Sequence, residues 1–372
     1  MNKKSRRYKS ILSLATLQFD GHVTEYFRKN SEKLVAWYLL PRGGNIKNFV
    51  ALYRNGRLIE RKEFFSPRYL ILAYAWYYLE FLYILILYFP LGETFYFINF
   101  QPFFFFFRPV IRLFWRIEYV YWVGDYWPMN VLSIRFFRML MHYYHDRSAY
   151  TLYLSDRINK VMNYGRIVRS PGRGTVMWGI KPPTDYRHKR STQTITLCFI
   201  GVLTQWQGID ALLSIVAKNP NMRLTLIGTG HPSLTKKYRR FIEEHHVSDR
   251  VIFPNRFFYG KELARLVRDC DIGVALYDTN PNTVSYYADP AKIKQYAEFG
   301  LPIIMTDSAD IAGYISKYKA GVIVDRDPRH ITRAIRDIKQ HYERYTGGVK
   351  KFNDFFSYEV YYSRMFRFLE QR

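Results

Sequence analysis

Residues 286–306 read YYADPAKIKQYAEFGLPIIMT, the pattern of a loop, a short helix, a glycine and a buried strand. Asp289 is a suitable N-cap and Pro290 a suitable first helical residue. Gly300 suits the position just past a helix end, where left-handed residues are common. The pattern therefore predicts a helix over 290–299 within an αβ unit.

The start of this predicted helix is a candidate anion site. The first backbone amides of a helix have no partner within it, and the helix dipole favours negative charge there. Lys292 and Lys294 add positive charge to the first turn. The residues alone leave open an ordinary αβ unit whose lysines form a solvated face.

Alternating strands and helices extend over the rest of the chain. The first half begins with a strand over 10–16, the turn Asp20-Gly21-His22 and a helix, and a hairpin is expected at an edge around Asn55-Gly56. The pattern starts again with a strand over 195–200 and a helix over 209–218. Two doubly wound domains are predicted, for which 372 residues are sufficient.

The net charge of +25 is unevenly distributed. Residues 1–190 contain 30 Lys and Arg against 12 Asp and Glu. Aromatic residues, 19% of the chain, crowd the stretch 69–127, which suits an interface with one apolar and one wet side. An anionic membrane surface is the favoured partner, a basic protein with an aromatic core is the alternative, and nucleic acid lacks a recognisable reader motif.

The most apolar run, 69–89, is long enough to cross a bilayer, but Glu80 near its middle and its many tyrosines argue against a span. We expect a core helix or a helix in the membrane interface. Arg108, Arg112 and Arg116 follow at intervals of four, which would place them along one helix face. These arginines are the predicted membrane contact.

The cysteines and the N-terminus indicate a cytoplasmic protein. Cys198 and Cys270 lie in apolar contexts, which favours buried thiols in a reducing compartment. The basic N-terminus is not followed by an adequate signal-peptide core. The acid pair Asp325 and Asp327 is a weak candidate for metal ligation, because polar caps are expected where it lies.

Taken together, the second half resembles the C-terminal domain of family-4 glycosyltransferases with the GT-B fold, and the first half resembles the family more loosely. The resemblance implies two Rossmann-like α/β domains, 1–185 and 186–355, and a closing helix, 356–372, that packs back on the N-terminal domain. The matching segments are 199–203 (FIGVL), 224–230 (LTLIGTG), 251–253 (VIF), 271–274 (DIGV) and 289–304 (DPAKIKQYAEFGLPII).

The resemblance also implies a reaction, the retaining transfer of a sugar from a nucleotide diphosphate sugar to a membrane-associated or glycan acceptor. Surface polysaccharide or glycolipid synthesis at the cytoplasmic face of the plasma membrane is expected, with no metal or other cofactor, because dipoles and lysines can stabilise the departing diphosphate. His22 and Asp125 are the expected catalytic residues, with Asp20 and Gly21 on the acceptor side. The expected donor-binding residues are Gly201, Gln207, Gly228, Phe253, Asp289, Pro290, Ala291, Lys292 and Gln295.

The chain departs from the family where the donor is bound. Val202 and Gln207 replace the usual Arg and Lys at the phosphates, and Tyr287 and Gln295 replace two glutamates, the second of which binds the ribose. Gln295 can still donate and accept hydrogen bonds, and Lys292, Lys294 and the helix N-terminus could hold the phosphates. A catalytically inactive scaffold bound to the membrane surface is the second hypothesis.

Overall fold

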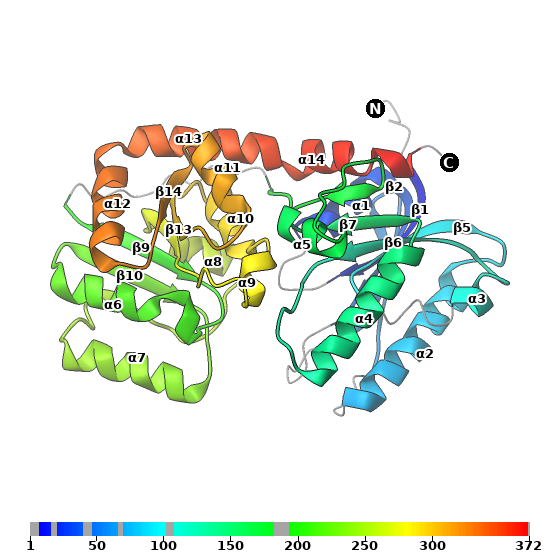
Figure 1. Cartoon of the computed structure of the whole chain (residues 1–372), viewed down its shortest axis with the longest axis horizontal. Coiled ribbons are helices and arrows are strands. Elements are labelled where there is room, and N and C mark those ends of the chain that lie inside the picture. The colour runs from blue at the N-terminus through cyan, green and yellow to red at the C-terminus, as the bar shows by residue number, and fades with distance from the viewer. Residues whose placement is uncertain are drawn as a thin grey trace. The chain divides into compact units, whose positions relative to one another are not determined.

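A computed structural model describes residues 7–15, 21–39, 47–65, 70–101, 108–181 and 193–370, with the backbone alone for 70–74. The chain forms two compact units (Figure 1). Unit 1 comprises Met1–Gly179 and Tyr358–Arg372, and unit 2 comprises Ile180–Ser357. The chain thus passes between units near residues 179 and 357, a few residues from the predicted boundaries at 185 and 355.

Unit 1 is built on a sheet with the strand order β4-β3-β2-β1-β5-β6-β7-β8. Its strands pair in parallel, except that β3 runs antiparallel to both β2 and β4. The strands are β1 (Tyr8–Ala15), β2 (Ser31–Tyr38), β3 (Phe49–Arg54), β4 (Arg57–Glu63), β5 (Thr94–Asn99), β6 (Arg116–Val123), β7 (Tyr150–Tyr153) and β8 (Arg173–Thr175). The helices are α1 (Val23–Asn30), α2 (Leu70–Tyr88), α3 (Arg108–Ile111), α4 (Leu132–Arg147), α5 (Asp156–Met162) and α14 (Tyr358–Met365).

The predicted edge hairpin is confirmed as β3 and β4. Asn55 and Gly56 join the strands with φ values of 49° and 80°, the left-handed conformations that a two-residue hairpin turn requires. The sheet begins at this hairpin, since β4 is the outermost strand.

The closing helix packs on unit 1, as predicted. The Tyr362 hydroxyl of α14 donates to the Gly21 carbonyl at 2.9 Å and accepts from the Gly179 amide at 2.7 Å. Farther along, Phe366 packs against Phe27 of α1 and Trp122 of β6. The C-terminal residues therefore complete the core of the N-terminal unit.

The helix α2 buries one face in the core of unit 1 and exposes the other face. Phe81, Ile84 and Leu85 are fully buried, whereas Leu79 and Ile86 on the opposite face are 57% and 72% exposed. No helix within the described ranges is both long enough and apolar enough to cross a bilayer.

Glu80 is the one acidic residue of α2, and it is buried. Its carboxylate accepts hydrogen bonds from Trp37 Nε1 at 3.0 Å and Asn48 Nδ2 at 3.3 Å. Burial nevertheless dominates and raises the pKa of Glu80 from 4.5 to about 7. The native state therefore binds more protons than the unfolded chain between these two values, and its stability falls as the pH rises through this window.

Glu80→Gln is expected to remove this pH dependence. The wild type should lose stability on the order of 3 kcal/mol between pH 4.5 and pH 8 through this one group, and the variant should not. Urea denaturation at pH 5 and pH 8 measures the difference, with Glu63→Gln on the exposed face of β4 as the matched control. The same loss in wild type and Glu80→Gln would contradict the assignment.

The predicted arginine stripe is wrong. α3 ends at Ile111, and Arg116 is the first residue of β6, so Arg108, Arg112 and Arg116 do not share a helix face. The helix stops because Trp115 buries its ring and donates from Nε1 to a backbone carbonyl following α2 at 2.8 Å. This tertiary contact turns the chain into β6 after a single helical turn.

Unit 2 is built on an all-parallel sheet with the order β11-β10-β9-β12-β13-β14. The strands are β9 (Ile195–Ile200), β10 (Met222–Ile227), β11 (Val251–Ile252), β12 (Ile272–Ala275), β13 (Ile303–Thr306) and β14 (Gly321–Val324). The helices are α6 (Ile209–Lys218), α7 (Pro232–Glu244), α8 (Gly260–Val267), α9 (Val284–Tyr287), α10 (Ala291–Glu298), α11 (Ile311–Tyr318), α12 (Pro328–Gln340) and α13 (Tyr342–Phe356).

The strand order places a topological switch between β9 and β12. The chain goes from β9 to β10 and β11 on one side, and then returns to build β12, β13 and β14 on the other. In open α/β sheets, ligands bind outside the carboxyl ends of the strands at such a point. The candidate site is therefore expected where β9 and β12 end.

Candidate functional site

Two glycines bring the ends of β9 and β10 together. Gly201 and Gly228 have φ values of +141° and +142°, where L side chains are strained. A Cβ on Gly228 would lie 1.8 Å from the Gly201 carbonyl oxygen, and a Cβ on Gly201 would lie 3.1 Å from Lys292 Nζ. The glycine at 228 allows the two turns to approach each other, and the glycine at 201 leaves space for the end of Lys292.

Lys292 reaches this switch point from α10. It is only 6% exposed, and its Nζ donates to Gln207 Oε1 at the end of the 3₁₀ helix η2 (Gln205–Gln207). The ammonium also lies 3.8 Å from the ring centre of Phe199 in β9 and 4.9 Å from that of Tyr277, which follows β12. Burial lowers the pKa of Lys292 well below its usual range.

Lys292 has no acidic partner among the residues that the structure describes. Buried lysines are normally paired, since an isolated buried charge is costly. An anion at this place would supply the missing charge and favour the protonated form of the amine. This edge of the unit 2 sheet is therefore the candidate anion site.

Lys294 does not contribute to this site, contrary to the prediction. Its Nζ lies 3.2 Å from Asp289 Oδ2, and both side chains are fully buried. The ammonium also lies 3.9 Å from the ring centre of Phe356. Lys294 is therefore a structural cation of the core, and the solvated lysine face considered as an alternative is also wrong.

The same ion pair changes the start of α10. The N-cap is Pro290, with no side-chain cap, rather than Asp289. Asp289 is directed to Lys294 in the core instead of to the first helical amides. The helix spans Ala291–Glu298, one residue shorter at each end than predicted.

The remaining predicted donor residues lie in unit 2 at different depths. Ala291 and Gln295 are half-buried on α10, and Pro290 is buried before it. Phe253 packs against the unit 2 core, with the Arg239 guanidinium 5.5 Å from its ring centre. Val202 is 53% exposed, so an apolar side chain stands where the resemblance implies an arginine.

The predicted residues of unit 1 gather at one edge of its sheet. His22 precedes α1 in a left-handed conformation (φ 61°), with Nδ1 3.8 Å from a Glu25 carboxylate oxygen. Asp125 is exposed just after β6, so both follow the carboxyl ends of parallel strands. Gly21 is packed against Trp178, whose ring a Cβ would approach to 2.6 Å. Asp20 lies outside the described residues.

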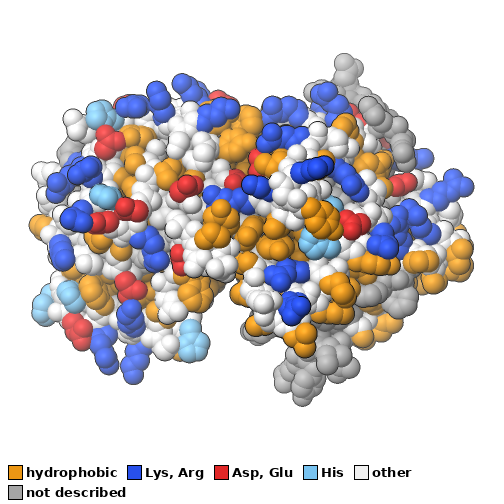
Figure 2. All heavy atoms as spheres, viewed as in Figure 1, with side chains coloured by type: hydrophobic (Ala, Val, Ile, Leu, Met, Phe, Trp, Pro, Cys, Tyr) orange, Lys and Arg blue, Asp and Glu red, His pale blue; other side chains and the backbone are white. Residues whose placement is uncertain are grey.

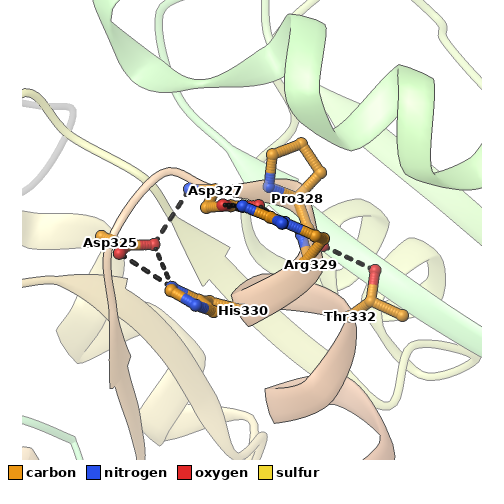
Figure 3. A network of polar contacts seen from close by, with 6 residues as sticks. All are labelled: Asp325, Asp327, Pro328, Arg329, His330 and Thr332. Atoms are coloured by element: carbon orange, nitrogen blue, oxygen red, sulfur yellow. Dashed lines mark hydrogen bonds and ion pairs between the residues drawn. The ribbon is translucent and has the colours of Figure 1, made fainter.

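The acid pair Asp325 and Asp327 forms a cap (Figure 3). Asp327 is the N-cap of α12 and accepts from the Arg329 amide at 2.8 Å. Asp325 accepts from the Asp327 amide at 3.0 Å and lies 2.8 Å from His330 Nδ1. The carboxylates are thus engaged by amides and basic side chains at the start of the helix, as the capping interpretation expected.

Sequence reasoning missed the aromatic and hydroxyl groups of the site. Tyr277 contacts Lys292 from the end of β12, and its carbonyl accepts from Thr306 Oγ1 at 2.7 Å. Phe199 also lay within a recognised segment without being assigned a role. A useful signal was the position of Phe199 and Tyr277, which lie near the carboxyl ends of β9 and β12, the two strands beside the switch point.

Comparisons with known proteins agree with this architecture. Residues 194–341 match the family described as Glycosyl transferases group 1. A comparison with curated protein sequences gave no match. The sucrose-phosphate synthase from Thermosynechococcus elongatus is 13% identical, with a TM-score of 0.67 over 96% of this chain and 97% of that one.

Two further solved structures are similar over nearly their whole length. Anabaena Alr3699/HepE in complex with UDP is 11% identical, with a TM-score of 0.63 over 96% of this chain and 98% of that one. WaaG, a glycosyltransferase involved in lipopolysaccharide biosynthesis, is 15% identical, with a TM-score of 0.57 over 95% and 96%. The two Rossmann-like units have the GT-B fold. The match of residues 194–341 to Glycosyl transferases group 1 agrees with the resemblance found in the sequence.

Proposed function

We propose that the protein is a retaining glycosyltransferase that takes a sugar from a nucleotide diphosphate sugar and transfers it to a membrane-associated or glycan acceptor. Surface polysaccharide or glycolipid synthesis is the proposed context. The observation that carries the proposal is Lys292, buried at the switch point of a domain of Glycosyl transferases group 1. Proteins with the same fold have been solved with UDP and with UDP-2-fluoro glucose, which supports this donor class.

The chemistry requires a group that stabilises the departing diphosphate. Negative charge grows on its oxygen as the sugar leaves, and fixed dipoles and cations placed there lower the barrier. Lys292 would supply the cation, and the N-terminal amides of α10 would supply dipoles. Gln207 would hold the ammonium in place beside the diphosphate.

The other predicted residues keep their proposed roles. Gln295 would hydrogen-bond the donor ribose, while His22 and Asp125 would act on the acceptor side or stabilise the transition state. The diphosphate is held by lysine and backbone dipoles in this proposal, so no metal is assigned to it.

A thermal-shift panel of nucleotide sugars tests the proposal. A ligand that binds only the native state at 100 times its Kd adds about 2.7 kcal/mol. For a unit of this size, that corresponds to a Tm increase of about 5–10 °C. One of UDP-glucose, GDP-mannose and ADP-glucose should give such an increase, and an unchanged Tm with all three would contradict the proposed donor site.

The second candidate function is a non-catalytic, membrane-bound scaffold. It is favoured by the exposed Val202 and by Gln295, which replace an arginine and a glutamate of the family. A scaffold that retains the nucleotide site would bind the donor without turnover. Release of free nucleotide from the donor that gives the largest Tm increase distinguishes an enzyme from a scaffold.

Gln295→Glu is expected to be tolerated, because Gln295 is half-buried on α10 and the two side chains have the same length. If Gln295 contacts the ribose, a carboxylate acceptor should tighten UDP binding about fivefold, since charged hydrogen bonds are stronger by about 1 kcal/mol. Isothermal titration measures the change, with Gln340→Glu on the exposed side of α12 as the matched control. Weaker binding in Gln295→Glu would exclude the ribose contact.

We further propose that unit 1 contacts an anionic membrane surface. Among the described residues, the large apolar side chains that are exposed belong to unit 1, apart from Val202, Trp206, Ile252 and Tyr259. The first 190 residues also hold most of the positive charge. Together these features are typical of proteins that lie on a bilayer.

A further inference from the structure

A groove of about 800 Å³ opens on unit 1 beside α3 and α4. A volume of roughly 300–1,000 Å³ is typical of sites for small molecules. No acidic side chain is found in its lining, as far as the described residues show. Its walls include three arginines, Arg108, Arg112 and Arg147, and three large apolar side chains, Phe136, Met139 and Tyr143.

In the part of the chain that is described, the arginines at the groove form no ion pair with an acidic side chain. Arg108 Nη1 donates to the Arg147 carbonyl at 2.6 Å, while its Nε is buried and makes no hydrogen bond to a described residue. The Arg147 guanidinium lies 3.8 Å from the ring centre of Tyr143, and Arg112 is exposed. The groove therefore offers arginines that are not held in ion pairs, although the Glu118 carboxylate acts on the charge of Arg108.

The apolar side of the groove continues along α4. Leu132, Phe136, Met139 and Tyr143 are 83%, 56%, 57% and 48% exposed. Their spacing of four, three and four residues places them on one face of the helix. Figure 2 shows apolar and basic side chains next to each other in this part of unit 1. An apolar stripe turned to solvent is unusual in a soluble protein and indicates an interaction surface.

We propose that this groove binds one anionic phospholipid, with an acyl chain along Phe136, Met139 and Tyr143 and the phosphate at Arg108 and Arg112. Guanidinium groups bind phosphate oxygens in a bidentate manner, and the α4 stripe matches a hydrocarbon chain. A nucleic acid would use the arginines and rings, but it would leave Leu132 and Met139 in water. The inference extends the proposed membrane contact and does not depend on transferase activity.

The test titrates the full chain with dioctanoyl phosphatidylglycerol, with glycerol 3-phosphate and with octyl glucoside. We expect saturable binding of one phosphatidylglycerol per chain and at least tenfold weaker binding of the other two probes, since each lacks the chain or the charge. Equal binding of glycerol 3-phosphate would overturn the proposal in favour of a site for free phosphate. Equal binding of octyl glucoside would overturn the role of the arginines.

Arg112→Glu is the decisive variant, because the exposed Arg112 side chain makes no hydrogen bond to another described residue and its replacement should leave the fold intact. We expect at least a tenfold loss of phosphatidylglycerol affinity with unchanged UDP binding, which belongs to unit 2. Arg333→Glu, with the same charge change on α12, should bind the lipid like the wild type. An equal loss in both variants would show a nonspecific charge effect, and no loss in Arg112→Glu would exclude the groove.

Discussion

Lys294→Ala is expected to lower the free energy of unfolding of unit 2 by about 3–5 kcal/mol, the usual effect of breaking a buried ion pair. The variant removes the cation 3.2 Å from the Asp289 carboxylate, while Asp289 stays fully buried. It also removes the ammonium from the face of the Phe356 ring. Urea denaturation followed by circular dichroism measures the loss.

Two further variants define the cause of this loss. Lys261→Ala, which removes an exposed lysine from α8, should change the stability by no more than about 0.5 kcal/mol. Lys294→Met combined with Asp289→Leu should cost less than Lys294→Ala alone, because no buried carboxylate remains. A double variant as unstable as Lys294→Ala would show that packing, and not the ion pair, is responsible.

Lys292→Met is expected to weaken UDP binding by about 10–150-fold, which corresponds to the loss of a charged hydrogen bond worth about 1.5–3 kcal/mol. Stability should be unchanged or higher, because Met fills a similar volume without a buried amine. Titration calorimetry and thermal denaturation measure the two effects. Weaker binding at full stability separates a binding role from a structural one, and equal UDP affinity would contradict the site.

An exchange of side chains tests the placement of this charge. The resemblance implies a phosphate-binding lysine at the position of Gln207, and Lys292 reaches Gln207 from α10. Gln207→Lys combined with Lys292→Gln should therefore recover most of the UDP affinity that Lys292→Gln alone loses. No recovery in a folded double variant would mean that the cation must come from α10.

Local sequence signals predicted much of the fold. The Asn55-Gly56 hairpin, the strand over 195–200 and the helix over 209–218 follow from turn chemistry and apolar periodicity, which act between near neighbours. The switch point itself comes from the strand order of the structure, which gives the edge of the sheet where Lys292 lies.

The features that the local sequence patterns did not predict depend on contacts between residues far apart in the chain. The arginine stripe failed because the buried Trp115 ends α3 after one turn. Asp289 and Lys294 look like a cap and a surface lysine, but they are paired in the core. Lys292 meets Gln207 across 85 residues, and no local pattern indicates that contact.

The central claim is that Lys292 holds the diphosphate of a nucleotide at the carboxyl edge of the unit 2 sheet. A crystal structure of the complex with UDP tests it most directly. We expect a diphosphate oxygen at hydrogen-bond distance from Lys292 Nζ, about 2.7–3.2 Å, beside the Gly201 and Gly228 turns. UDP bound elsewhere, or a Lys292 ammonium still held by Gln207 alone, would contradict the claim.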